Sequence, residues 1–336
     1  MRSDIAVLGA TGLVGREIVS LLEERDFPLD DISFYASSSS AGKTMQFKGR
    51  SIEIEELNMK NISDHDIFLS SLPGEVSSEY LPRIRDKSSG VIIDNSSAFR
   101  MDSEIPLVVP EINSEDLDGD KRHIANPNCS TIQMVMVLKP LLDEFGIERV
   151  IASTYQSVSG SGAEALKALE DESRRALQGE EEVKPEYYRH PIAFNLLPDI
   201  DYFHEDGFSQ EEIKMRQETR KILHREDLSV NCTCVRVPVK FGHAESVYLE
   251  LGGSFSLLEV YNLLERMPGV VVEDNPAEGV YPTPLTAEDS DKVFVGRMRR
   301  DRDNEQGLHL YIVADNIRKG AALNAVQIAE ELLNEE

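Results

Sequence analysis

Short apolar runs alternate with amphipathic stretches through the first third of the chain. Residues 5–8 form an apolar run typical of a buried strand, and apolar positions then recur at helical spacing over 14–22. Further strand-like runs lie at 32–36, 66–69 and 91–94. This alternation predicts an α/β region with a parallel, doubly wound sheet.

The pattern changes near Val150. Longer strand patterns, which predict an antiparallel or mixed sheet, occur at 150–158, 229–239, 245–252 and 308–314. Helical patterns occur at 162–177, 210–223 and, at the end of the chain, 320–333. We expect a surface loop over 178–189. The second region is therefore predicted to be α+β.

Composition narrows the range of functions. The 336 residues favour one or two domains, and the formal net charge of −26 argues against a nucleic acid or an anionic membrane as partner. The acidic residues are dispersed, which is typical of a solvated surface. No apolar run approaches the roughly 20 residues that span a bilayer. Three cysteines and a strand-like opening in place of a signal peptide favour a reducing, cytoplasmic setting.

A glycine-rich turn follows the first predicted strand. The segment GATGLVG places glycines at Gly9, Gly12 and Gly15, directly before an amphipathic helix. Glycines let the backbone approach a pyrophosphate, and the helix N-terminus adds N–H donors and positive potential. A dinucleotide site is the prediction, and a turn that needs only a flexible backbone is the alternative.

A serine-rich turn follows the second predicted strand. Ser37, Ser38, Ser39 and Ser40 stand there with Lys43 nearby, and no acidic residue is placed to bind the ribose of NAD. This favours the 2′-phosphate of NADP. Local hydrogen bonding within the turn is the alternative explanation.

Cys129 precedes an apolar helical pattern in the segment NPNCST, residues 126–131. A thiol at a helix N-terminus is stabilised as thiolate by the helix dipole and free N–H groups, so we expect a nucleophile. A small buried cysteine is the alternative. Cys232 and Cys234 lack a second ligand pair at zinc spacing, so we expect no metal site.

Alternation along 232–239 places Arg236 on the face opposite the valines. His243 follows seven positions later, after a Phe-Gly turn. Taken singly, both residues also fit ordinary structural roles, as a surface arginine and a turn histidine.

Eight motifs in order resemble the aspartate-semialdehyde dehydrogenase family over nearly the whole chain. They are GATGLVG at 9–15, DNSSAFR at 94–100, VVPEIN at 108–113, NPNCST at 126–131, YQSVSGSG at 155–162, EEIKM at 211–215, RVPVKFGH at 236–243 and ADNIRKGAALNA at 314–325. The resemblance implies a Rossmann-like NADP-binding domain over 1–128, completed by a C-terminal helix over 318–336. It also implies a catalytic and dimerisation domain over 129–317.

The implied reaction is the reversible oxidation of L-aspartate 4-semialdehyde, with NADP and phosphate, to L-4-aspartyl phosphate. In the reductive direction it feeds the biosynthesis of lysine, threonine, methionine and diaminopimelate. The resemblance implies a thiohemiacetal and a thioester on Cys129, with His243 as general acid/base and Gln156 orienting the intermediate. It assigns Arg236 to the substrate carboxylate and Glu211 to the amino group.

The same resemblance implies the remaining contacts. Phosphate is expected on Arg100 and Lys214, with Asn95 alongside. Cofactor contacts are expected from Gly9, Thr11, Gly12, Leu13, Val14, Ser37, Ser38, Ser39, Gly74, Ser159, Gly160 and Asn316.

Two positions depart from the family pattern. Ser39 stands where many bacterial members carry an arginine, which removes a strong partner of the 2′-phosphate and leaves NAD open as cofactor. Leu72-Pro73-Gly74 replaces a common Ala-Gly-Gly and keeps only the last glycine.

Two other functions compete with this interpretation. N-acetyl-γ-glutamyl-phosphate reductase shares the reaction logic, but its substrate has a blocked amino group and gives Glu211 no purpose. A silent nucleotide-binding dimer has no reason to hold Cys129, Gln156, Arg236 and His243 together. The resemblance implies a homodimer or a homotetramer.

Overall fold

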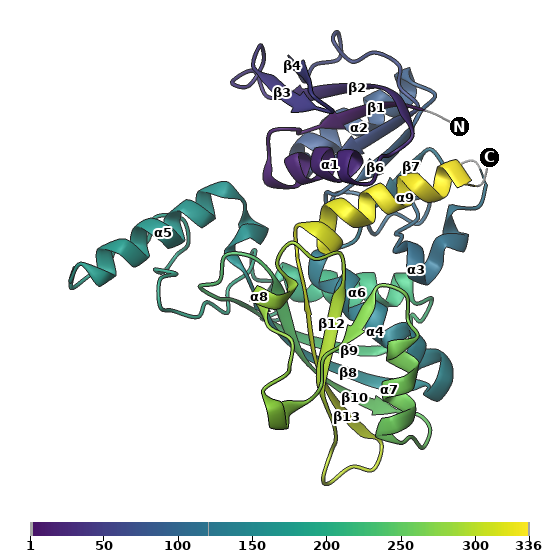
Figure 1. The fold of residues 1–336 in the computed structure, drawn as a ribbon, viewed down its shortest axis with the longest axis vertical. Coiled ribbons are helices and arrows are strands. Elements are labelled where there is room, and N and C mark those ends of the chain that lie inside the picture. The colour runs from purple at the N-terminus through teal and green to yellow at the C-terminus, as the bar shows by residue number, and fades with distance from the viewer. Residues whose placement is uncertain (1–2, 120, 335–336) are drawn as a thin grey trace. The chain divides into compact units, whose positions relative to one another are not determined.

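The computed structural model describes residues 3–119 and 121–334 (Figure 1). The chain divides into two compact units, one formed by residues up to Asn128 together with those from Ala321 onward, and one by Cys129–Gly320. The predicted fold class is confirmed, because the first unit holds a mainly parallel sheet and the second a mixed sheet.

The first unit is built on a seven-stranded sheet in the order β3-β4-β2-β1-β5-β6-β7. Its strands are β1 (Ser3–Leu8), β2 (Leu29–Ala36), β3 (Thr44–Phe47), β4 (Arg50–Glu56), β5 (Ile67–Ser70), β6 (Val91–Asp94) and β7 (His123–Ala125). Its helices are α1 (Leu13–Glu24), α2 (Gly74–Lys87), α3 (Pro110–Asn113) and α9 (Leu323–Asn334), with a 3-10 turn at Ser114–Leu117. All neighbouring strands are parallel except the antiparallel pair β3–β4.

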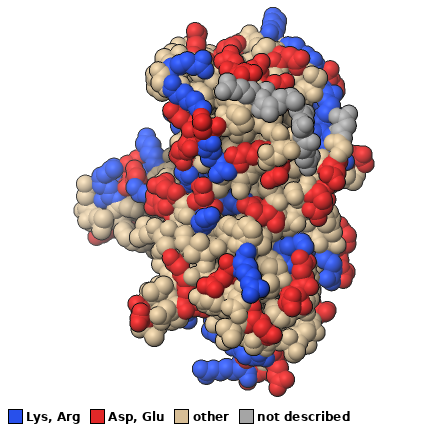
Figure 2. All heavy atoms as spheres, turned by 45° about the vertical axis from the view of Figure 1, so that its right-hand side comes forward, with Lys and Arg blue, Asp and Glu red and all other residues tan. Residues whose placement is uncertain are grey.

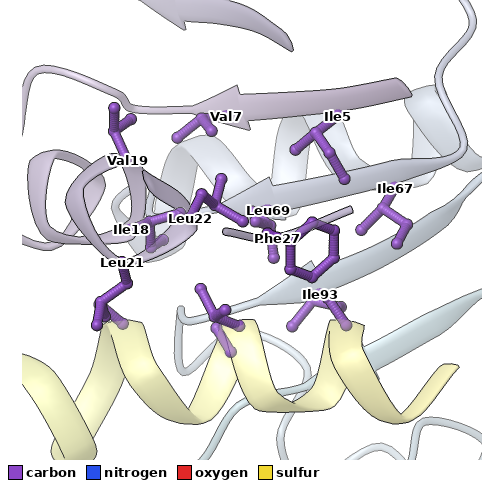
Figure 3. Close-up of a cluster of buried hydrophobic side chains, with 14 of the residues drawn as sticks. Ile5, Val7, Ile18, Val19, Leu21, Leu22, Phe27, Ile67, Leu69 and Ile93 are labelled. Atoms are coloured by element: carbon purple, nitrogen blue, oxygen red, sulfur yellow. The ribbon is translucent and has the colours of Figure 1, made fainter. Parts of the chain in front are cut away.

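Aliphatic side chains of β1, α1 and α9 form the main core of this unit. Helix α9, from the far end of the chain, packs against α1, and Figure 3 shows Leu21 and Ile93 beside it. The contact of α1 with β1 depends on Gly15, because a Cβ there would lie 2.2 Å from the carbonyl oxygen of Gly9.

The second unit is built on a six-stranded sheet in the order β11-β12-β13-β10-β8-β9. Its strands are β8 (Ile147–Gln156), β9 (Ser229–Arg236), β10 (His243–Leu251), β11 (Val270–Val272), β12 (Val293–Arg300) and β13 (Gly307–Ala314). Its helices are α4 (Cys129–Phe145), α5 (Ala163–Leu177), α6 (Gln210–Ile222), α7 (Leu257–Glu265) and α8 (Pro284–Ala287). Single turns occur at Val158–Ser161, Pro276–Glu278 and Arg318–Ala322. Helix α4 packs on β8, β10 and β13, and α6 packs on β9.

Several elements differ from the sequence expectation. The β3–β4 hairpin was not predicted, because its alternating polar residues pack only a few side chains, such as Phe47 and Ile54, into the core. The terminal helix begins with a π turn, Arg318–Ala322, before α9 proper. The loop expected over 178–189 is largely exposed, as predicted.

The surface carries both signs of charge. Figure 2 shows acidic and basic side chains interspersed over the visible face, with tan areas between them. Within the described residues, no helix combines the length and apolar character needed to cross a bilayer.

Candidate active site

The thiol of Cys129 stands at the first residue of α4, as the sequence predicted. Most of the helix that follows is buried, whereas Cys129 itself remains partly exposed. Gly320, in the π turn, lies against it, because a Cβ at Gly320 would be 2.9 Å from the Cβ of Cys129. Cys129 is therefore partly accessible to solvent, and Gly320 lies in close contact with it.

Three predicted site residues share one row across the sheet that α4 covers. Gln156 of β8 pairs with Arg236 of β9, and the register of β8 with β10 brings His243 to the other side of Gln156. All three side chains are buried. The structure thus brings Gln156, Arg236 and His243 together from three separate strands.

The face carrying Arg236 is the covered one. The sequence placed it opposite the valines, which suggested an outward-facing guanidinium, but α6 packs on the side of β9 that carries Cys232, Cys234 and Arg236. Period-two alternation separates the two faces of a strand and does not say which one a helix covers.

His243 is held in one orientation. The backbone N–H of Ser157 donates to His243 Nδ1 at 3.0 Å, and Nε2 has no hydrogen-bond partner in the described residues. Burial, followed by the nearby Arg236 charge, lowers the pKa of His243 to about 3. The imidazole is therefore neutral near pH 7, with its proton on Nε2, since Nδ1 faces a donor.

Arg236 is anchored by backbone groups. Its Nη1 donates to the carbonyl oxygen of Ser157 at 2.7 Å, and its own backbone forms two hydrogen bonds with Leu197, at 2.8 and 2.9 Å. Its Nε is buried and has no partner in the described part of the chain. A buried, charged N–H group without a protein partner is suited to bind the carboxylate of a ligand.

Gly160 marks the point where these donors converge. A Cβ at Gly160 would lie 3.0 Å from Arg236 Nη1 and 3.2 Å from His243 Nε2. Gly160 itself is exposed. The missing side chain leaves an approach to both buried groups.

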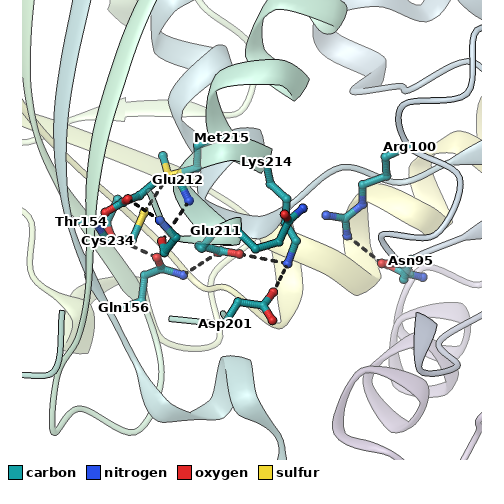
Figure 4. A network of polar contacts seen from close by, with 12 residues as sticks. Asn95, Arg100, Thr154, Gln156, Asp201, Glu211, Glu212, Lys214, Met215 and Cys234 are labelled. Carbon is teal, nitrogen blue, oxygen red and sulfur yellow. Dashed lines mark hydrogen bonds and ion pairs between the residues drawn. The ribbon is translucent and has the colours of Figure 1, made fainter. Parts of the chain in front are cut away.

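The carboxylate of Glu211 links the row to helix α6. Gln156 Nε2 donates to Glu211 Oε1 at 3.0 Å, and Lys214 Nζ lies 3.4 Å from Glu211 Oε2 (Figure 4). Lys214 is 2.6 Å from Asp201, whose φ of 72° is unusual for a residue other than glycine. A capping box at Ser209 starts α6 just before Glu211 and fixes the first turn.

Asn316 joins the end of the second unit to the same site. Its Oδ1 accepts hydrogen bonds from Ser157 Oγ at 2.9 Å, Ser159 Oγ at 3.2 Å and the backbone N–H of Gly242 at 2.9 Å. Gly242 directly precedes His243, so Asn316 also fixes the turn that presents the imidazole.

The other two cysteines have a different character. Burial raises the pKa of both Cys232 and Cys234 well above the ordinary value, with nearby glutamates adding to the effect. Both remain protonated thiols. Within the described residues, no group of three histidine, cysteine or acidic side chains could hold a metal ion.

In the first unit, the glycine-rich loop is shaped for close backbone approach. Gly9 has φ of 81°, and a Cβ there would lie 2.9 Å from Ser71 Oγ. Gly12 is the N-cap of α1 and Leu13 is its first residue, which directs the helix N-terminus at the loop. Thr11 Oγ1 accepts a hydrogen bond from Ser40, so the loop adjoins the serine-rich turn. These features fit a bound pyrophosphate.

The serine-rich turn is exposed at Ser37, Ser38 and Ser39. The hydroxyls of Ser37 and Ser39 are 2.9 Å apart, so some of the turn's polar groups bond locally. Gly74 begins α2, and an added Cβ there would make an ordinary van der Waals contact with Ser97 Oγ at 3.8 Å.

Arg100 and Asn95, both expected at phosphate, contact each other in the first unit. Arg100 Nη2 donates to the carbonyl oxygen of Asn95 at 2.8 Å (Figure 4). Asn126, three residues before Cys129, donates to Asn95 Oδ1 at 2.7 Å. Lys214, the other predicted phosphate ligand, belongs to the second unit.

Sequence reasoning missed Ser157, Asp201 and Gly320. Ser157 lies inside the recognised YQSVSGSG motif, but its bond to His243 needs the fold. Asp201 sits in a loop without a chemical motif. Gly320 lies within ADNIRKGAALNA, and only the π turn, in which its N–H donates to Asp315 O at 2.9 Å, sets it against the thiol.

Comparison with known proteins identifies the family of the chain. The family model described as "Semialdehyde dehydrogenase, NAD binding domain" matches residues 4–119, and the one described as "Semialdehyde dehydrogenase, dimerisation domain" matches 138–319. The aspartate-semialdehyde dehydrogenase of Aquifex aeolicus is 52% identical over 98% of both chains. That of Bacillus subtilis is 45% identical over 98% of this chain and 96% of its own.

The chain belongs to the aspartate-semialdehyde dehydrogenase family.

Solved structures of family members have the same fold. The aspartate-semialdehyde dehydrogenase II of Vibrio cholerae, also solved in complex with ASA, superposes with a TM-score of 0.95 at 41% identity over 99% of both chains. The Candida albicans enzyme, solved with NADP, has a TM-score of 0.76 at 25% identity and covers 99% of this chain and 98% of its own. The resemblance inferred from the sequence is confirmed.

Proposed function

We propose that the protein catalyses the reversible, phosphate-dependent oxidation of L-aspartate 4-semialdehyde to L-4-aspartyl phosphate with NADP, through a covalent intermediate on Cys129. The observation that carries this proposal is the row of Gln156, Arg236 and His243, in which two buried donors, Arg236 Nε and His243 Nε2, have no partner in the described residues. The relative solved with ASA supports the choice of substrate.

Substrate orientation follows from the charges of the site. Arg236 presents its donors to the α-carboxylate, and Glu211, held by Gln156 and Lys214, accepts the α-ammonium group. A substrate with an acetylated amino group would leave the buried Glu211 carboxylate without that partner, at a cost in binding. The pair therefore favours the aspartyl over the N-acetylglutamyl substrate.

The first chemical step forms a C–S bond. The Cys129 thiolate, favoured by the start of α4, attacks the aldehyde carbon, and the carbonyl π electrons move to oxygen to give a thiohemiacetal oxyanion. His243 Nε2–H is the donor for this oxygen. Because Ser157 N–H occupies Nδ1, the neutral imidazole enters this step as the acid of its proposed general acid/base role and donates from Nε2.

The second half-reaction returns the free thiol. A bound nicotinamide supplies the acceptor for the hydride that leaves the thiohemiacetal carbon. The resulting Cys129 thioester is attacked by phosphate, the C–S bond breaks, and the thiolate leaves as aspartyl phosphate forms. Arg100, Lys214 and Asn95 are the proposed phosphate ligands, and they supply local positive charge in a chain of net charge −26.

For the cofactor, the glycine-rich loop and the exposed serine turn support a dinucleotide with a 2′-phosphate. The relative solved with NADP supports the same choice. The proposed contacts are those of Gly9, Thr11, Gly12, Leu13, Val14, Ser37, Ser38, Ser39, Gly74, Ser159, Gly160 and Asn316. Ser39 in place of arginine weakens the preference for NADP over NAD.

A homodimer is the proposed assembly. The dimerisation-domain match covers most of the second unit, and the outer face of β8 exposes Ile151 and Tyr155. Because both residues lie inside the segment that the dimerisation-domain model matches, we propose that this face takes part in the contact. We place the enzyme in the cytoplasm, in line with three cysteines that form no disulfide in the described residues and with a biosynthetic role in the aspartate family.

The test is a steady-state assay of NADPH formation with L-aspartate 4-semialdehyde, with and without phosphate, using NADP and NAD. We expect turnover that requires phosphate and disappears in Cys129→Ala, while NADP still binds. Preference for N-acetylglutamate 5-semialdehyde would identify the reductase instead. Cofactor binding with no turnover on either aldehyde would indicate a silent nucleotide-binding dimer.

A further inference from the structure

A second row of polar groups lies directly behind the catalytic row. Glu245 of β10 pairs with Thr154 of β8, and Thr154 pairs with Cys234 of β9. Glu245 lies two residues after His243, whereas Thr154 and Cys234 lie two residues before Gln156 and Arg236. All three side chains are buried, and Glu245 is 0% exposed. The proposed chemistry gives Glu245 no role.

Helix α4 carries one polar residue for each of these two rows. Gln133 follows Cys129 by four residues, so the two side chains lie on one face of the helix, one turn apart. Gln133 is buried, and its side chain lowers the pKa of Glu245 against the larger, raising effect of burial. Cys129 with His243 and Gln133 with Glu245 thus form successive layers between α4 and β10.

Within the described residues, no cation pairs with Glu245. Residues 129–138 of α4 contain no charged side chain, and its strand neighbours are Thr154 and Ile312. The titratable groups around it are Cys232 and Cys234 on β9 and His243 on its own strand, all neutral near pH 7. Burial raises the pKa of Glu245 well above its ordinary value, in accord with a neutral carboxylic acid.

The hydrogen-bonding capacities of the two side chains match. Both oxygens of Glu245 and both polar atoms of Gln133 lack a partner in the described residues. A carboxylic acid and a primary amide satisfy one another, because the acid O–H donates to the amide oxygen while the amide N–H donates to the acid carbonyl. We propose that Glu245 and Gln133 form such a neutral pair and act as positioning residues that hold the first turns of α4, and with them Cys129, above His243.

This inference rests on the proposed role of Cys129, and its experiment separates the two. The rate of Cys129 alkylation by iodoacetamide is measured from pH 6 to 9, together with kcat, KM and thermal stability. The buried Cys232 and Cys234 should not react. If alkylation of Cys129 leaves wild-type activity intact, the nucleophile proposal fails, whereas the pair is still judged by stability in a double-mutant cycle.

Glu245→Leu should lower kcat and the alkylation rate about 10-fold or more with KM nearly unchanged, since small displacements of reacting groups cost such factors. Glu245→Gln keeps two-point pairing with Gln133 and should stay within about 2-fold of wild type across the pH range. The double variant Gln133→Leu with Glu245→Leu should be more stable than the sum of the single losses predicts, because no orphaned group remains.

Leu249→Ala is the matched control. Leu249 is equally buried on the same face of β10, farther from His243, so its loss should lower stability without changing the alkylation profile. Three results would overturn the proposal. They are a 10-fold loss in a folded Glu245→Gln variant, additive stability losses in the double variant, and a destabilised Glu245→Leu variant with wild-type kcat and alkylation.

Discussion

Substitution of Gly320 by alanine tests the close contact between Gly320 and Cys129, the proposed nucleophile. An added Cβ would lie 2.9 Å from Cys129 Cβ and 3.4 Å from its Cα. Carbon atoms in contact prefer roughly 3.5–4.0 Å, so the two groups must separate by about 0.6 Å or more. The carbonyl oxygen of Asp315 would be 3.3 Å from the new Cβ, which limits movement away from Cys129.

The separation must therefore be taken up largely by the first turn of α4. Misplacement of a reacting group by up to an ångström costs as much as about 100-fold in rate, so we expect kcat to fall about 30- to 100-fold, or about 2–3 kcal/mol of activation free energy. Overpacking should also lower the free energy of unfolding by about 1–3 kcal/mol.

The assay is phosphate-dependent NADPH formation, combined with the rate of Cys129 alkylation and with NADP affinity, which should not change. Gly253→Ala is a matched control, because its Cβ would meet the Phe145 carbonyl oxygen at 3.2 Å, at the opposite end of α4 from the thiol. A Gly320→Ala enzyme with kcat and alkylation within about 2-fold of wild type would refute this steric reasoning.

Four further predictions address other parts of the molecule. Gly160→Ala should raise KM for the semialdehyde about 10-fold, because its Cβ would lie 3.0 Å from Arg236 Nη1. Ser39→Arg should raise the NADP-to-NAD ratio of kcat/KM about 10-fold, through a charge-assisted hydrogen bond of about 1.5 kcal/mol. Ile151→Asp, at an exposed position of β8, should convert dimers into monomers in sedimentation experiments. The unfolding free energy should fall by about 2 kcal/mol between pH 7 and 5, because the pKa of His243 is about 3 in the folded protein against an ordinary value of 6.5, and only the unfolded chain binds the proton in that range.

For each of these four predictions, a specific result would contradict the reasoning. An unchanged KM in Gly160→Ala would mean that the substrate does not pass that glycine. An unchanged cofactor ratio in Ser39→Arg would place the 2′-phosphate elsewhere. Dimers that persist in Ile151→Asp would exclude the outer face of β8 as the contact. In His243→Gln the extra loss of stability below pH 7 should disappear, and its persistence would assign that loss to other groups.

The alternating pattern of the first unit predicted its parallel sheet well, because those strands are short and buried. The run at 91–94 coincides with β6, and the glycine-rich turn lies at the start of α1, as expected. The β3–β4 hairpin escaped prediction because its few core contacts, such as that of Phe47, give little apolar signal.

The sequence motifs named the candidate site residues, but they did not predict how these residues are arranged in space. Local sequence was enough to place Cys129 at a helix start, because a polar, turn-forming segment precedes an apolar helical pattern. The row of Gln156, Arg236 and His243 depends on strand register and order, which bring residues up to 87 positions apart, from 156 to 243, to one edge of the site. Long-range pairing of this kind leaves no local trace in a sequence.

By itself, the sequence determined the family and the two kinds of sheet, since these follow from ordered motifs and from hydrophobic period, and it predicted Cys129 as the nucleophile. The tertiary structure decided which face of β9 is covered by α6 and which nitrogen of His243 carries the proton. It also placed Gly320 in contact with Cys129. These features arise from contacts between segments far apart in the chain. Packing and hydrogen-bond geometry, not residue type, set them.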